Sequence, residues 1–297
     1  MSGPRFPDLH VHTHFSDDGD YSPRELVAAA ERAGVNMIAF TDHDSAAATL
    51  DTSPPGIAVL PGVEISSGLR GVEVHILAYG IDPNHPTLRE ILQTNDRYRR
   101  RQADRRLHLL EAQGFRVDAE RAVELAGGRP PKTGALLAML HQLNPSDERL
   151  FAYGTPERPD WSSFYRDFFS PGGVASSPLQ SIAPTEIVGM IQQMDAVPVL
   201  AHPGVLSRYL QADVVTQLIR SLKDEGLEAL EAYTSWHNRE QAEMFHQLAR
   251  DLGLDVTVGS DYHGPTSKPH VRLGDPQWTP AAVRRSVYAA YLPLCLD

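Results

Sequence analysis

The side chains best suited to chemistry in this sequence are histidines and carboxylates that stand at short, regular spacings near the N-terminus. The segment 8–22 reads DLHVHTHFSDDGDYS, with histidines at three alternate positions followed by three aspartates. Residues two apart on a β-strand point to the same face, so His10 and His12 would present two imidazoles together. Imidazole and carboxylate groups in this arrangement are typical ligands of a divalent metal ion.

Comparable side chains stand at or near the ends of six further apolar segments. They are Asp42, His43, Asp44, Glu64, His75, His202, Ser235, His237, Asp261 and His263. A single histidine at such a place is more often structural, and an aspartate there is often a helix cap. So many imidazoles and carboxylates on one rim would be costly to bury without cations between them. The joint pattern therefore favours a metal site.

The elements that must position these groups are predicted from apolar runs rich in β-branched residues. Seven strands are expected, at 8–12, 37–41, 57–60, 72–79, 197–201, 228–232 and 255–260. Helical patterns separate most of them, at 23–34, 184–194, 212–225 and 238–253. Alternating strands and helices predict a parallel sheet, and seven such units predict an α/β barrel with its active site at the carboxyl ends of the strands.

A long segment without a convincing strand interrupts this alternation. We expect the barrel to be formed by 1–85 and 184–297, and the residues 86–183 to form a helical insertion that caps the carboxyl-terminal face. Helices are predicted within it at 87–113, 118–126 and 133–143. Long insertions on one face of a barrel are often functional.

The first helix of the insertion carries six arginines between Arg97 and Arg106. Arg97, Arg101 and Arg105 would lie on one face at four-residue spacing. An arginine run with interspersed aspartates is commonly a solvated helix face. The alternative is that one or two guanidinium groups hold a phosphate remote from the cleaved one, which their fork geometry suits.

Composition limits the class of protein and the kind of metal site. The 297 residues are 41% hydrophobic, contain no apolar run of membrane length and begin without a signal-peptide pattern, so we expect a soluble cytoplasmic protein with no membrane partner. The net charge of -11 argues against duplex nucleic acid as a partner. Cys295 is the single cysteine, so a metal would be held by imidazole and carboxylate. Nothing indicates an obligate protein partner.

The motifs DLHVHTHFSDDG, TDHD, GVEIS, AHPG and GSDYHG, in this order, resemble the polymerase and histidinol phosphatase (PHP) family of metal-dependent phosphoesterases. The resemblance implies a distorted (β/α)7 barrel of PHP type. More narrowly, the length and the arginine-rich insertion are similar to the branch that contains 3′,5′-nucleotide bisphosphate phosphatases and exonucleases that trim short RNA from the 5′ end.

The resemblance also implies a ligand set and two or three divalent ions. His10, His12, Glu64 and Asp261 would hold one ion; Glu64, His75 and His202 a second; Asp17, His43 and His263 a third. Many relatives have histidine where this chain has Asp17, and the aspartate favours manganese, magnesium or iron over zinc. Manganese is the first expectation.

The implied activity is that of a phosphomonoesterase acting on a small phosphorylated nucleotide, by in-line attack of a metal-bridging hydroxide. The first candidate reaction removes the 3′-phosphate of adenosine 3′,5′-bisphosphate. Glu64, His202 and Asp261 would be catalytic, and His237 could protonate the leaving group. Candidate substrate contacts are Arg97, Arg101, Arg129, Lys132, Thr133, Arg208, Ser235 and His237. Pro131 departs from the RPH pattern of relatives, which weakens the case for that segment.

Four other functions stay open from the sequence. Two are enzymes of the same family: a 5′-3′ exonuclease on short RNA, and a phosphatase of a metabolite such as histidinol phosphate. The third is a non-catalytic metal-binding scaffold. The fourth is hydrolysis of a carbon-centred amide or ester, against which the lack of a lysine near a strand end counts.

Overall fold

The computed structural model describes residues 6–50, 57–178, 180–274 and 278–295. The chain divides into two compact units, one formed by Met1–Leu92 with Ile182–Asp297 and the other by Gln93–Ser181. Each of the two units has its own hydrophobic core. No helix within the described ranges is both long and apolar enough to cross a membrane.

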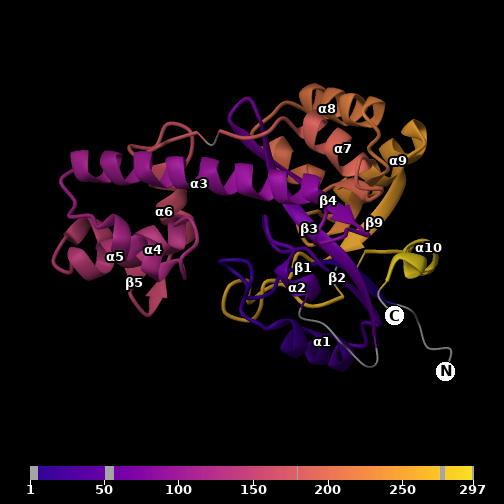
Figure 1. The fold of residues 1–297 in the computed structure, drawn as a ribbon, viewed down its shortest axis with the longest axis horizontal. Helices are drawn as coiled ribbons and strands as arrows, with labels where there is room; N and C mark the ends of the chain where they lie inside the picture. The colour runs from indigo at the N-terminus through magenta and orange to yellow at the C-terminus, as the bar shows by residue number, and fades with distance from the viewer. Residues whose placement is uncertain (1–5, 51–56, 179, 275–277, 296–297) are drawn as a thin grey trace. The chain divides into compact units, whose positions relative to one another are not determined.

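The first unit is built on a seven-stranded, barrel-shaped sheet (Figure 1). Its strands, in spatial order, are β1 (Pro7–Val11), β2 (Met37–Phe40), β3 (Ala58–Leu69), β4 (Val72–Tyr79), β7 (Val197–Leu200), β8 (Ala229–Thr234) and β9 (Asp255–Gly259). The segments that follow β9 and β1 then bridge the two edges. The amide of His12 donates to the carbonyl of Tyr262 over 2.9 Å, and the amide of Asp261 donates to the carbonyl of His10 over 2.8 Å. The seven predicted strands and the distorted barrel are confirmed.

The sheet is mixed, so the prediction of a purely parallel sheet is wrong. β4 runs antiparallel to both β3 and β7, whereas the other neighbouring strands are parallel. The reason is a two-residue turn, Arg70–Gly71, with φ of 53° and 80°. Two successive positive φ values are the geometry that joins antiparallel strands in a tight hairpin. β3 also continues to Leu69, well beyond its predicted end at residue 60.

Helices cover the outside of this sheet, and most of them begin where the sequence predicts. They are α1 (Pro23–Arg32), α2 (Ala47–Leu50), α7 (Pro184–Gln192), α8 (Ala212–Asp224), α9 (Arg239–Leu252) and α10 (Ala281–Tyr291), with short turns η3 (Pro203–Arg208) and η4 (Leu292–Leu294). Ser22 and Glu25 form a capping box at the start of α1. Helix α10 was not predicted, because its alanine-rich sequence buries only Arg284, Val287 and Tyr291 and so gives little apolar periodicity.

The second unit is helical, apart from a small hairpin. Its elements are most of α3 (Pro86–Ala112), which begins in the first unit, then α4 (Ala119–Leu125), α5 (Thr133–Leu143), η1 (Glu148–Tyr153), β5 (Gly154–Thr155), β6 (Arg158–Pro159), α6 (Trp161–Phe164) and η2 (Tyr165–Phe169). Phe164 and Phe168 stack at 4.4 Å, and the ring of Tyr153 lies 5.2 Å from that of Phe164. These aromatic side chains form the core of the unit, whereas Trp161 and Tyr165 are exposed.

Candidate metal centre

Eight of the nine predicted ligands converge at one end of the sheet. His10 lies in β1, Glu64 in β3 and His75 in β4, while His12, His43, His202, Asp261 and His263 follow the ends of β1, β2, β7 and β9. Within the described residues, four groups of three or four metal-ligating side chains have their ligand atoms within 4.8 Å of one another, and these eight residues supply all but one of the members. His75 joins them from the middle of its strand.

The first group consists of His10, His12 and Asp261. The Nε2 atoms of the two histidines lie 3.1 Å apart, and Asp261 Oδ1 lies 3.4 Å from His10 Nε2 and 3.1 Å from His12 Nε2. Ligand atoms about 2.1 Å from one ion are separated by about 3.0 Å in an octahedron and about 3.4 Å in a tetrahedron. The spacings therefore fit a single divalent ion at the centre of the group.

Glu64 is completely buried and divides its two oxygens between neighbouring groups. Its Oε2 lies 3.4 Å from Nε2 of both His10 and His12, whereas its Oε1 lies 2.8 Å from His75 Nδ1 and 3.1 Å from His202 Nε2. Glu64 Oε2 makes no hydrogen bond despite this crowding. A buried carboxylate oxygen that faces imidazole nitrogens without hydrogen-bonding geometry fits a ligand that bridges two ions.

Asp18, and not Asp17, joins the third group. Asp18 Oδ2 lies 3.4 Å from His263 Nε2 and 3.8 Å from His43 Nε2, and His12 completes the group. Asp17 is exposed and belongs to none of the metal-ligating groups of the described chain. The assignment of Asp17 to the third group is thus corrected. Alternation cannot fix which of two adjacent aspartates turns inward, because both lie in the irregular turn after β1.

Three of the imidazoles are oriented by acceptors behind them. His10 Nδ1 donates to Glu231 Oε1 over 3.0 Å, His12 Nδ1 donates to Ser16 Oγ over 3.0 Å, and His263 Nδ1 donates to the carbonyl of Asp261 over 2.9 Å. Each bond directs Nε2 inward, where its lone pair would be free to bind an ion once the ring is neutral, which is the usual arrangement behind a metal-binding histidine.

Glu231 was not predicted as part of the site, whereas Asp42 was included in the pattern of polar side chains at the strand ends, with a helix cap as the alternative. Glu231 also accepts the amide of His202 over 2.8 Å, so one buried carboxylate orients two ligand residues. Asp42 instead accepts the amides and hydroxyls of Thr13 and Ser16 and so shapes the turn after β1. The available signal for Glu231 was a charged residue inside an otherwise apolar strand.

The backbone is strained where two ligands leave their strands. His202 has φ of 27° and Asp261 has φ of 55°, values in the left-handed region that side chains other than glycine seldom adopt. Such conformations cost on the order of 1–3 kcal/mol and concentrate at functional sites. The strain here accompanies the direction of both side chains toward the ligand cluster, Asp261 toward His10 and His12 and His202 toward Glu64.

Electrostatics in the cluster favour an ionised Glu64 and shift the pKa values of the surrounding imidazoles in opposite directions. Against the effect of burial, neighbouring carboxylates raise the pKa of His10 well above its usual value and that of His75 to about 10. Burial opposes ionisation of Glu64, but the charges of His75, His43 and His10 more than offset it and hold the pKa of Glu64 well below its usual value. Burial, together with His263 and His43, lowers the pKa of His12 well below its usual value. An ionised glutamate and a neutral imidazole are the forms that bind a metal ion.

His237 has a structural role in this conformation, which overturns its assignment as proton donor and substrate contact. Its Nε2 accepts the amide of Gly204 over 2.8 Å, and its Nδ1 donates to the carbonyl of Ala232 over 2.9 Å. The side chain is buried, and a Cβ on Gly204 would lie 2.6 Å from the ring. Both ring nitrogens are occupied in holding η3 against the end of β8, so neither can reach a substrate.

The other predicted substrate contacts fall into two sets. Arg208 is exposed on η3, with its guanidinium 5.0 Å from the ring of Trp236, and Ser235 lies in the turn after β8. Arg97, Arg101, Arg129, Lys132 and Thr133 belong to the second unit. There Arg97 and Arg101 are exposed on α3, while Thr133 is buried at the start of α5.

Two unpredicted residues, Trp236 and Lys268, contact Asp261. The indole Nε1 and the ammonium Nζ each lie 2.5 Å from Asp261 Oδ2. A lysine therefore does lie near a strand end, contrary to the expectation from sequence. Its ammonium group pairs with one carboxylate rather than connecting two ligand groups.

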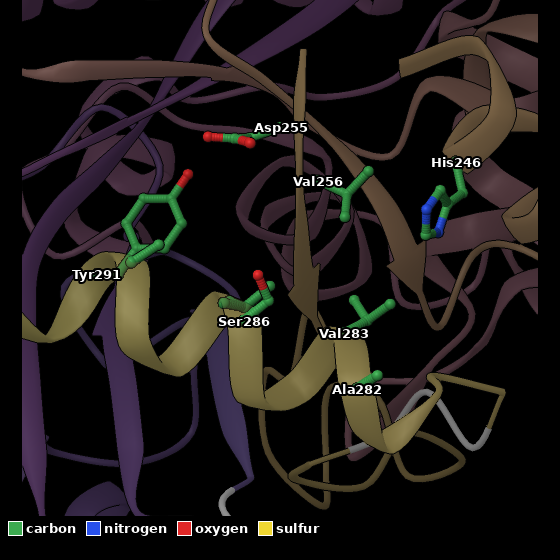
Figure 2. Close-up of a pocket in the computed structure, with 9 residues that line it drawn as sticks. His246, Asp255, Val256, Ala282, Val283, Ser286 and Tyr291 are labelled. Atoms are coloured by element: carbon green, nitrogen blue, oxygen red, sulfur yellow. The ribbon is translucent and has the colours of Figure 1, made fainter. Parts of the chain in front are cut away.

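A separate cavity of about 300 Å³ lies between α9, β9 and α10, and Figure 2 shows the residues that line it. Its polar lining comes from His246, Asp255, Ser286 and Tyr291. Asp255 begins β9, whereas Asp261 follows the end of that strand, so the cavity lies at the other end of β9 from the ligand groups. One imidazole and one carboxylate do not make a ligand set of the kind seen at the metal centre.

Comparison with known proteins gives one family model and several full-length relatives. Residues 8–111 match the model of the PHP domain. The chain is 32% identical to phosphoribosyl 1,2-cyclic phosphate 1,2-diphosphodiesterase of Eggerthella lenta, over 89% of this chain and 97% of that protein. It is 30% identical to the 5′-3′ exoribonuclease Rnm of Salmonella typhimurium, over 93% of this chain and 90% of that protein.

A further relative and a solved structure are also similar to the chain over most of its length. The 3′,5′-nucleoside bisphosphate phosphatase of Chromobacterium violaceum is 27% identical, with 87% of each chain covered. A crystal structure from Bifidobacterium adolescentis, described as a metal-dependent phosphoesterase, superposes with a TM-score of 0.78 at 26% identity, over 100% of this chain and 99% of that one.

Proposed function

The chain belongs to the PHP family of phosphoesterases, and from that premise we propose that it is a metal-dependent phosphoesterase that removes the 3′-phosphate of a nucleoside 3′,5′-bisphosphate. The observation that carries the proposal is Glu64, whose two buried oxygens face two different groups of imidazoles. A bridging carboxylate of this kind serves a centre with more than one ion. We infer two or three ions, with manganese as the first candidate.

Bound divalent ions would supply an activated water and would neutralise charge on the phosphate oxygens. His10, His12, Glu64 and Asp261 are suited to one position, and Glu64, His75 and His202 to a second. Asp18, His43 and His263 are suited to a third. No side chain of the cluster needs to act as a covalent nucleophile.

The side chains around the cluster would orient the ligands and bind the substrate. Glu231 keeps the Nδ1 proton of His10 on the outer side of the ring, so that Nε2 offers its lone pair to the centre. Arg208 and Lys268 lie 5.0 and 4.9 Å from the ring of Trp236, and Lys268 also pairs with Asp261. Two cations at this rim support a substrate that is an anion, and a guanidinium suits a phosphate.

A nucleoside bisphosphate is the first candidate substrate because it presents one phosphate for cleavage and a second for recognition. The phosphatase of Chromobacterium violaceum, a relative that spans most of the chain, is named for this substrate. Arg208 and Ser235, which follow β7 and β8, are the contacts that we propose in the first unit. His237 is not among them.

A second candidate function, 5′-3′ hydrolysis of short RNA, is favoured by the surface of α3. Arg101 and Arg105 are exposed one turn apart, and within the described ranges neither forms an ion pair. Their separation along the helix axis, about 6 Å, is comparable with the spacing of neighbouring phosphates on an extended strand. The exoribonuclease Rnm of Salmonella typhimurium shares 30% identity with the chain.

The test is product analysis after the chain has been stripped of metal and reloaded with manganese. The substrates are adenosine 3′,5′-bisphosphate, AMP, a 5′-phosphorylated tetraribonucleotide and phosphoribosyl 1,2-cyclic phosphate. We expect AMP and phosphate from the bisphosphate, with a higher kcat/KM than for the other three. Preferred cleavage of the tetraribonucleotide would replace the first candidate by the second, and preferred opening of the cyclic ester would reject both.

The variants His12→Ala and His14→Ala provide a matched control. Loss of partners that only orient a metal ligand costs about 10- to 100-fold in affinity or activity, so loss of the ligand His12 should cost at least about 100-fold. His14 is exposed and belongs to none of the ligand groups in the described chain, so its replacement should leave the rate unchanged. An unimpaired His12→Ala enzyme would refute the metal-centre proposal.

A further inference from the structure

We propose that Trp236 and Lys268 are positioning residues that hold one oxygen of Asp261 away from the metal centre, so that the other oxygen alone is offered as a ligand. The inference rests on the proposed metal centre and deepens it. It concerns how this chain controls the coordination of one carboxylate.

The two oxygens of Asp261 have different surroundings. Oδ2 lies 2.5 Å from Trp236 Nε1 and 2.5 Å from Lys268 Nζ, which are both hydrogen-bond donors. Oδ1 lies 3.1 Å from His12 Nε2, 3.4 Å from His10 Nε2 and 3.5 Å from His263 Nδ1. One oxygen is therefore saturated by donors, while the other faces the imidazole nitrogens of the cluster.

This division matters because a carboxylate can bind a metal ion through one oxygen or through both. Rotation of the Asp261 side chain would bring Oδ2 toward His10 and His12 and would occupy a second coordination position. Two donors on Oδ2 oppose that rotation, since it would break two short hydrogen bonds, one of them charge-assisted. A coordination position is thereby kept for water or substrate.

The Trp236 ring also fixes the lysine. Lys268 Nζ lies 4.9 Å from the ring and Arg208 Cζ lies 5.0 Å from it. Cations at these distances from an indole are attracted to the ring. Lys268 is mostly buried, with 15% of its side chain exposed, so its ammonium group is confined between the indole and the carboxylate.

Direct measurement of manganese binding by titration calorimetry tests the inference. Trp236→Phe removes one donor but keeps an aromatic ring and leaves the charge of Lys268 in place. Lys268→Met removes the other donor, whereas Lys268→Arg keeps both the positive charge and the ability to donate. Trp278→Phe and Lys223→Met are matched controls at exposed positions outside the cluster. Thermal unfolding in EDTA verifies that each variant is folded.

We expect manganese affinity to fall about tenfold in Trp236→Phe and further in the double variant with Lys268→Met, while Lys268→Arg and both controls stay near wild type. Wild-type affinity in Trp236→Phe and in the double variant would overturn the inference. Tighter binding by Lys268→Met would overturn the role of the lysine, because its ammonium would then act only by repelling the ion. A wild-type chain that binds no manganese would instead reject the metal centre itself.

A second readout separates positioning from general damage to the site. At saturating manganese, Trp236→Phe should lower kcat for the best phosphate ester and leave KM within about twofold, because the change alters the orientation of a ligand and not the substrate contacts. A rise in KM with unchanged kcat would assign Trp236 to substrate binding and would contradict a positioning role.

Discussion

At the scale of single residues, the metal centre depends on which atom of each side chain faces inward. His10, His12 and His263 each commit Nδ1 to an acceptor, and Asp261 commits Oδ2 to two donors. The atoms that remain are those that lie about 3 Å from one another in the cluster. The donors and acceptors behind the ligands therefore matter as much as the ligands.

The pair Asp17 and Asp18 gives a sharp test at this scale. We expect Asp18→Asn to lower metal-dependent phosphate release by about 10- to 100-fold, less than the loss of a whole ligand, because asparagine keeps a side-chain oxygen but removes the charge. Asp17→Asn should have an effect of less than about twofold, since Asp17 is exposed and outside the groups. Steady-state kinetics with the same substrate and manganese concentration compare the two. The reverse order of effects would restore Asp17 as the ligand.

At the scale of elements, two local devices bring the ligands to one place. The Arg70–Gly71 turn reverses the chain, so that β4 delivers His75 opposite Ser66 of β3 and near Glu64. The second device is the contact between His237 and Gly204. It ties the start of η3, which directly follows His202 in the chain, to the end of β8. Neither device supplies a ligand itself, yet each sets the position of one.

His237 predicts a pH dependence of folding stability. Burial lowers its pKa to about 4, whereas an exposed histidine has a pKa of about 6.5. The unfolded chain therefore binds more protons between about pH 4 and 6.5, and the contribution of this residue to stability falls as the pH falls through that window. From pH 7.5 to pH 5 the loss should be about 2 kcal/mol.

The measurement is the free energy of unfolding in denaturant, with EDTA present throughout, for wild type and His237→Gln. We expect wild type to lose about 2 kcal/mol more than the variant between pH 7.5 and pH 5, because glutamine does not titrate. Equal losses in the two proteins would show that His237 is not buried as the neutral form.

The exposed arginines of α3 test the RNA alternative at the same scale. In the double variant Arg101→Gln/Arg105→Gln, binding of a 5′-phosphorylated tetraribonucleotide should weaken about tenfold. The slope of log K for RNA binding against log salt concentration should become shallower by about 1.4, which corresponds to two lost phosphate contacts. The kcat/KM for adenosine 3′,5′-bisphosphate should stay within about twofold.

Fluorescence anisotropy at several salt concentrations provides the binding data. Arg24→Gln/Arg220→Gln, at exposed positions of the first unit, is the charge-matched control. An equal loss in the control, or an unchanged salt slope in the α3 variant, would assign Arg101 and Arg105 to a solvated surface.

At the scale of the whole molecule, the two units differ in charge and in chemistry. The second unit, Gln93–Ser181, has 13 basic and 11 acidic residues, whereas the rest of the chain has 14 basic and 27 acidic residues. The first unit, which is the acidic one, contains the ligand groups. Its net negative charge favours the binding of divalent cations. The more basic unit is suited to contact with phosphate.

Calorimetric unfolding should report this division. A ligand present at about 1,000 times its Kd stabilises the folded state by about 4 kcal/mol, which corresponds to a rise in Tm of roughly 10 °C for a unit of this size. We expect manganese to shift the transition of the first unit, with a smaller or no shift in a transition of the second. Magnesium-free buffer with EDTA is the reference, and coincident curves with and without manganese would contradict a metal centre in the fold.

The sequence by itself determined the seven strands and most helix boundaries, and its resemblance to the PHP family indicated eight side chains that converge in the structure. These follow from local causes: apolar periodicity defines the elements, and alternation along β1 places His10 and His12 on one face. The motifs were also sufficient to indicate the PHP family. Such features depend on near neighbours in the chain, so they are visible without coordinates.

Only the tertiary structure decided which groups stand behind the ligands. Glu231, Trp236 and Lys268 reach the site from β8 and from the segments after β8 and β9, and nothing in their local sequence specifies a partner on β1 or β3. The choice of Asp18 over Asp17 and the structural use of His237 have the same origin. Each depends on where a side chain meets residues far along the chain, and that is fixed by closure of the barrel.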